Sequence, residues 1–124
     1  MFNVLVDDAR DVAQVPNVDI ILRNPRTALA VLKSLQGNIG VLNMDNDMGI
    51  RDFDRDGPGP EFPEGRHILA EFLHFCMSND LEDVYPPVVY LITANSVGMD
   101  HMCRDLERYG YTCHPSDRRT WVRQ

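Results

Sequence analysis

The chain has 124 residues, of which 44% are hydrophobic and 25% charged, and this composition suits one globular domain over residues 1–124. The net charge of −7 argues against a duplex nucleic acid partner, and no apolar run approaches the roughly 20 residues of a membrane-spanning helix. The three cysteines are odd in number and widely spaced, and the N-terminus has no basic signal region, so we expect a reducing cytoplasm without disulfides, zinc or membrane contact.

The first part of the chain carries alternating strand and helix signals. Residues 2–6 are apolar apart from one asparagine and predict a short buried strand, and residues 18–23 predict a second. Asn24 and Pro25 are residue types favoured at the N-cap and first position of a helix. Apolar residues then recur on one helical face until Gly37, where the helix is expected to end.

The second part of the chain repeats this alternation. We expect strands at 39–44, 88–93 and 111–113, helices at 66–78 and 98–109, and a polar tail after residue 113. The stretch 50–65 has no periodicity and is predicted to be a long loop, and loops of this length are often functional. Because it follows the strand at 39–44 directly, we expect it near the site, where it would be a substrate lid, although it could also be a solvated insertion. Strands that alternate with helices predict a parallel sheet with helices on both faces, which binds ligands beyond the carboxyl ends of its strands.

Polar side chains follow four of the predicted strands at that edge. They are Asp7 and Asp8, Asp45 and Asp47, Thr93 and Asn95, and His114. Converging carboxylates repel one another unless a cation is shared between them, and hard oxygen ligands of this kind suit Mg²⁺. We therefore expect a magnesium site formed by the four aspartates, although Asp47 could equally be a turn residue. A hydroxyl and an amide beside the metal could hold a phosphoryl oxygen.

These residues resemble the receiver domains of two-component response regulators. The resemblance implies a flavodoxin-type three-layer sandwich with five mostly parallel strands in the order 2-1-3-4-5. It also implies that Asp7 and Asp8 bind Mg²⁺, that Asp45 accepts phosphate and that Thr93 touches the phosphoryl group. The lysine that precedes a proline in receivers is replaced here by His114, and the single lysine, Lys33, lies in the first predicted helix.

The chain is more similar to the divergent receivers called cyclic-phosphate processing receiver domains. The segments that carry this resemblance are DDAR, RTALAVL, NMDNDMG, GRHIL and ITANSVGMDHM. The family has a reduced or absent first receiver helix, as the helix-poor stretch 9–17 suggests here. The family commonly has His-Ser before Ala-Asn, where this chain has Ile92 and Thr93.

Two functional hypotheses follow from this resemblance. The first is Mg²⁺-dependent phosphoester hydrolysis of a small cyclic phosphate or nucleotide. Asp45 would be ligand or nucleophile, Arg10 and Asn95 would bind the phosphate, and His114 would protonate the leaving alcohol. Arg10 could instead pair with a nearby surface acid, and His114 could be an exposed loop residue. The second hypothesis is a non-catalytic signalling or partner-binding module, with or without phosphorylation of Asp45.

Overall fold

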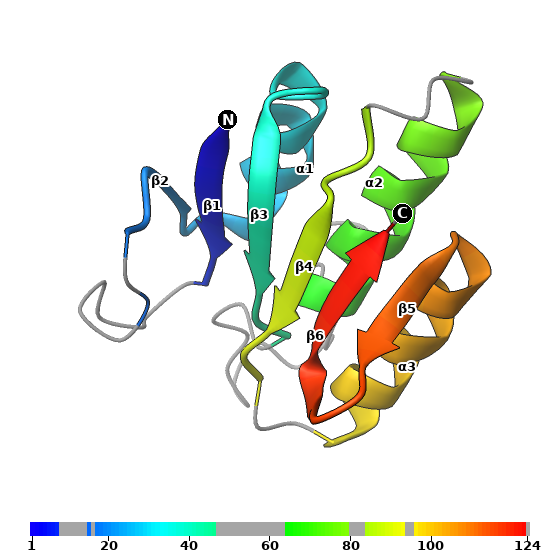
Figure 1. Ribbon diagram of the computed structural model, residues 1–124. Helices are drawn as coiled ribbons and strands as arrows, with labels where there is room; N and C mark the ends of the chain where they lie inside the picture. Colours follow the sequence, from blue (N-terminus) through cyan, green and yellow to red (C-terminus); the bar gives the residue numbers. More distant parts are fainter. Residues whose placement is uncertain (8–14, 16, 47–63, 80–83, 94–95, 124) are drawn as a thin grey trace.

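The computed structural model describes residues 1–7, 15, 17–46, 64–79, 84–93 and 96–123 (Figure 1). Its strands are β1 (Phe2–Val6), β2 (Ile20–Leu22), β3 (Ile39–Met44), β4 (Val88–Leu91), β5 (Tyr111–His114) and β6 (Asp117–Arg123). Its helices are α1 (Pro25–Ser34), α2 (Gly65–Ser78) and α3 (Ser96–Arg108). The predicted receiver-like α/β fold is confirmed, with six strands in place of five.

The six strands form one mixed sheet in the order β2-β1-β3-β4-β6-β5. The first four strands in this order are parallel, so their carboxyl ends share one edge, which we call the carboxyl edge. β6 is antiparallel to both β4 and β5, so β5 itself runs in the direction of β4. The hairpin between β5 and β6 consequently turns at the carboxyl edge.

The prediction of a polar tail after residue 113 is therefore wrong for residues 117–123, which form β6. The chain turns back and inserts β6 between β4 and β5, in register Val89 with Trp121. Trp121 is 3% exposed, and its indole Nε1 donates to Arg118 O at 2.9 Å. Burial of this large side chain in the core stabilises β6, although most of the strand's other residues are polar.

The three described helices lie side by side on one face of the sheet (Figure 1). The core lies between them and the sheet, around Phe72, Leu32, Leu42 and Met102, none of which is exposed. We expected helices on both faces of the sheet. Among the described residues, helices cover only one face, so this part of the chain has two layers. No helix in this part of the chain is both long and apolar enough to cross a membrane.

Local sequence signals account for the boundaries of α1. Asn24 Oδ1 accepts a hydrogen bond from Arg26 N at 2.9 Å, and Pro25 takes the first helical position, as predicted. Gly37 follows the helix with a φ of 77°, a left-handed conformation that glycine adopts without steric cost. Residues 8–14, 16 and 47–63 include most of the expected loop and most of the stretch where a reduced or absent first helix was expected, and they lie outside the described residues.

Candidate functional site

Asp7 and Asp45 lie side by side at the carboxyl edge. Val6 of β1 is in register with Met44 of β3, and Asp45 N continues the ladder by donating to Val6 O at 3.0 Å. Neighbouring strands are about 4.8 Å apart, so the two aspartates that follow are close neighbours. Asp7 is 2% exposed and Asp45 is 7% exposed. The structure therefore brings two of the predicted acids together in a largely buried place.

Thr93 belongs to the same edge. Met44 is in register with Leu91 of β4, and Ile92 N donates to Met44 O at 3.0 Å. Thr93, one residue further along, is 1% exposed. A buried hydroxyl thus follows the strand next to Asp45, as the sequence led us to expect.

The N-terminus of α2 packs directly against Asp45. Gly65 N donates to Asn46 O at 2.7 Å, and a Cβ added at Gly65 would lie 1.6 Å from Asp45 O. Only glycine permits this close approach of two backbones. The N-terminus of a helix carries partial positive charge, so its position here favours negative charge beside Asp45.

Asn46 connects β3 to two helices, a role that the sequence alone did not reveal. Its Oδ1 accepts from Arg66 N at 3.1 Å, and its Nδ2 donates to Glu64 Oε2 at 3.1 Å. A Cβ added at Gly98 of α3 would lie 2.3 Å from Asn46 Cγ. The available signal was an asparagine between two site aspartates, together with a glycine at the start of each following helix.

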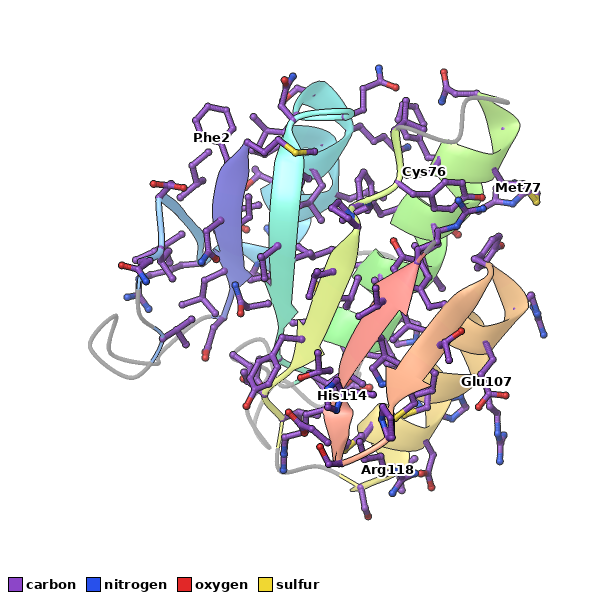
Figure 2. All side chains as sticks on the ribbon, viewed as in Figure 1. Phe2, Cys76, Met77, Glu107, His114 and Arg118 are labelled. Carbon is purple, nitrogen blue, oxygen red and sulfur yellow. The ribbon has the colours of Figure 1, made fainter. Side chains whose placement is uncertain are left out.

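His114 lies at the carboxyl edge (Figure 2). It ends β5, the outermost strand, and β6 separates β5 from β4 in the sheet. It is exposed, and its Nδ1 lies 3.2 Å from Ser116 N, which donates to it. The structure therefore does not set His114 against Thr93 and Asp45. Lys33 lies on α1 with its Nζ 5.3 Å from the ring centre of Phe75, away from the carboxyl edge.

The remaining predicted site residues are Asp8, Arg10, Asp47 and Asn95, and they lie outside the described residues. Within the described ranges, no three His, Cys, Asp or Glu side chains are arranged to hold a metal ion. Mg²⁺ characteristically uses one or two carboxylates and completes its octahedron with water and phosphate oxygens. The buried pair Asp7 and Asp45 fits that requirement.

A shallow pocket of about 390 Å³ lies beside the α2 N-terminus and is lined by residues of α2 and α3. These residues are Arg66, His67, Ala70, His101 and Asp105. His67 Nδ1 accepts from Glu64 N at 3.1 Å, and burial, followed by the charge of Arg66, lowers the pKa of His67. Burial raises the pKa of the Asp105 carboxyl.

The parallel β2-β1-β3-β4 sheet, with acids after β1 and β3 and a hydroxyl after β4, defines a receiver-like domain. The family model of the cyclic-phosphate processing receiver domain matches residues 2–108, which is most of the chain. The chain belongs to this family, as its motifs indicated. Neither the curated proteins nor the solved structures gave a match.

Proposed function

We propose that this protein catalyses Mg²⁺-assisted hydrolysis of a small cyclic phosphate or nucleotide at the carboxyl edge. The observation that carries the proposal is the pair of largely buried carboxylates, Asp7 and Asp45, at adjacent strand ends. Two negative charges at neighbouring strand ends are stabilised when a cation is shared between them. Membership of a family associated with cyclic-phosphate processing points to the substrate class.

In this proposal Asp7, Asp8 and Asp45 hold the metal. Asp47 is either a fourth ligand or a turn residue. When bound, Mg²⁺ would polarise a phosphoryl oxygen of the substrate and lower the pKa of a coordinated water. The hydroxyl of Thr93 and the amide of Asn95 orient the phosphate, and the α2 N-terminus favours its negative charge.

Arg10 and His114 complete the proposed set of residues. Arg10 would bind the phosphate. His114 would donate the proton to the leaving alcohol, which requires a substrate that extends along the edge past the start of β6. An imidazole can act as a proton donor near neutral pH.

The test is turnover of a 2′,3′-cyclic nucleotide followed by ³¹P NMR with Mg²⁺ and with EDTA. We expect hydrolysis only with Mg²⁺, loss of turnover in Asp45→Asn, and a rate about 10–1000-fold lower in Thr93→Ala, because one transition-state hydrogen bond is deleted. Asp100→Asn, which changes a half-exposed acid on α3, is the matched control and should keep the wild-type rate. An inactive wild type, or an active Asp45→Asn, would refute the proposal.

A second function is favoured by the contacts around Asp45. Its backbone touches Gly65 of α2, and the adjacent Asn46 packs against Gly98 of α3. Phosphorylation of Asp45 would therefore act on the N-termini of both helices and change the surface they present to a partner protein. Treatment with acetyl phosphate or beryllofluoride, followed by hydrogen exchange, tests this signalling role. Altered exchange in α2 and α3 without cyclic-phosphate turnover would favour it over the enzyme.

A further inference from the structure

Arg119 lies at the start of β6, outside the 2–108 range that the family model matches. Its Nη1 donates to Leu91 O at 3.0 Å and to Thr93 O at 2.9 Å. The guanidinium is therefore hydrogen-bonded just beyond the end of β4, to the backbone of Thr93, whose hydroxyl is proposed to orient the phosphate. Insertion of β6 beside β4 is what brings Arg119 to this position.

Among the described residues, the guanidinium is held through only one of its three nitrogens. Arginine has five N–H donors, and two bonds from Nη1 use both hydrogens of that nitrogen. Within the described residues, Nη2 and Nε form no further hydrogen bond and no carboxylate forms an ion pair with Arg119, although its charge is a minor cause of the lowered pKa of Asp117. Nη2 and Nε together form the planar fork that binds two oxygens of a phosphate.

The strand that carries Arg119 is fixed at its first residue. Asp117 Oδ1 accepts from Arg119 N at 3.0 Å, and Asp117 Oδ2 accepts from Thr120 Oγ1 at 2.7 Å. These bonds lower the pKa of Asp117, with the bond from Thr120 as the larger cause. The backbone of Arg119 is thus held before any ligand arrives, which reduces the entropy lost on binding.

We propose that Arg119 binds the phosphate group of the ligand at the carboxyl edge, with its Nη2 and Nε donating to two phosphate oxygens. This inference deepens the proposed function and rests on it for the identity of the ligand. In this inference β6 provides a cationic group for the phosphate. Lys33 and His114 do not provide one, because neither lies beside Thr93 and Asp45.

A different role for the same side chain is purely structural. The β4–β6 ladder ends at Tyr90 and Thr120, and the guanidinium extends it by bonding the carbonyl of Leu91, the last residue of β4, and that of Thr93 beyond it. Two substitutions separate the roles. Arg119→Gln retains an N–H donor for the carbonyls but loses the charge, whereas Arg119→Lys retains the charge.

The experiment measures binding of inorganic phosphate with Mg²⁺ present, by isothermal titration calorimetry, alongside the urea denaturation midpoint of each variant. We expect phosphate affinity to fall about 10–100-fold in Arg119→Gln and less than 10-fold in Arg119→Lys, because charge-assisted bonds are lost only in the first. Arg118→Gln is the control. The guanidinium of Arg118 is exposed and pairs with Asp100 at 2.8 Å, so its removal should leave the phosphate affinity unchanged.

The outcomes distinguish this inference from the proposed function. Three results would each overturn the role of Arg119. The wild type could show no detectable phosphate binding, or Arg119→Gln could bind phosphate as tightly as the wild type. The third result is an affinity loss in both variants that follows their loss of stability. Phosphate binding that depends on Arg119, in a protein that does not turn over cyclic nucleotides, would support the anion site and refute the enzyme.

Discussion

Replacing Gly65 with alanine tests the close contact between α2 and β3. The added Cβ would lie 1.6 Å from Asp45 O and 2.9 Å from Asn46 Cα, and both are backbone atoms that cannot rotate away. Real Cβ contacts essentially never fall below 3.0 Å, so the helix start must move by at least 1.4 Å, the difference between 3.0 and 1.6 Å.

This displacement strains the bond from Gly65 N to Asn46 O, which is 2.7 Å long, and the bond from Arg66 N to Asn46 Oδ1, at 3.1 Å. Overpacking costs about 1–3 kcal/mol and each lost hydrogen bond about 1 kcal/mol. We therefore expect Gly65→Ala to lower the free energy of unfolding by about 3–5 kcal/mol, a large share of the roughly 5–15 kcal/mol of a typical domain.

The assay is urea denaturation followed by the fluorescence of Trp121, the single tryptophan, which is 3% exposed in the folded protein. Gly40→Ala is the matched control, because its Cβ would lie 3.1 Å from Cβ of Met1, a 76% exposed terminal residue that can move. That control should change the unfolding free energy by less than about 1 kcal/mol. Equal stability of the two variants would refute the proposed close contact.

Two further predictions concern the core and the response to pH. Phe72→Ala should cost about 3–5 kcal/mol of unfolding free energy in urea, because the side chain is fully buried, and Phe2→Ala, at a 41% exposed position, should cost less than about 1 kcal/mol; similar losses would mean that the core is misassigned. The lowered pKa of His67 favours the neutral ring in the folded state, so its contribution to stability is present above pH 6.5 and declines as pH falls through 6.5 toward the lower folded pKa. Melting temperatures from pH 8 to 5 should therefore fall less steeply in His67→Gln than in wild type or in the exposed control His74→Gln, and identical slopes would contradict this assignment.

The parts of the fold that local sequence determines were predicted closely. β1 and β3 have the predicted bounds, because each is a mostly apolar run, interrupted by one asparagine, that is followed directly by aspartate. The start of α1 followed from Asn24 and Pro25, whose capping depends only on neighbouring residues. The helix starting at Gly65 and the one starting at Ser96 differ from prediction by only one or two residues.

β6 was missed because its residues are mostly polar and its partner strands are distant in sequence. The stretch from Asp117 to Arg123 buries only Trp121 fully, so it lacks the apolar alternation of a predicted strand. Its place between β4 and β5 depends on long-range pairing and on the turn after His114.

The same limit applies to the site. The residues that follow parallel strands could be grouped by the rule that strand ends meet at one edge, and Asp7, Asp45 and Thr93 do lie there. Arg119 reaches that edge only because β6 runs antiparallel, so no local pattern indicated its position. The packing of Gly98 against Asn46 likewise joins segments that are far apart in the chain.

The central claim is that the largely buried pair Asp7 and Asp45 binds Mg²⁺ for phosphoester chemistry. The most direct test is isothermal titration of Mg²⁺ into wild type, Asp7→Asn, Asp45→Asn and the control Asp100→Asn. We predict one Mg²⁺ site in the wild type and the control, and affinity at least about 10-fold lower in the other two variants, since each loses one charged ligand. No Mg²⁺ binding by the wild type, or equal affinity in all four proteins, would contradict the claim.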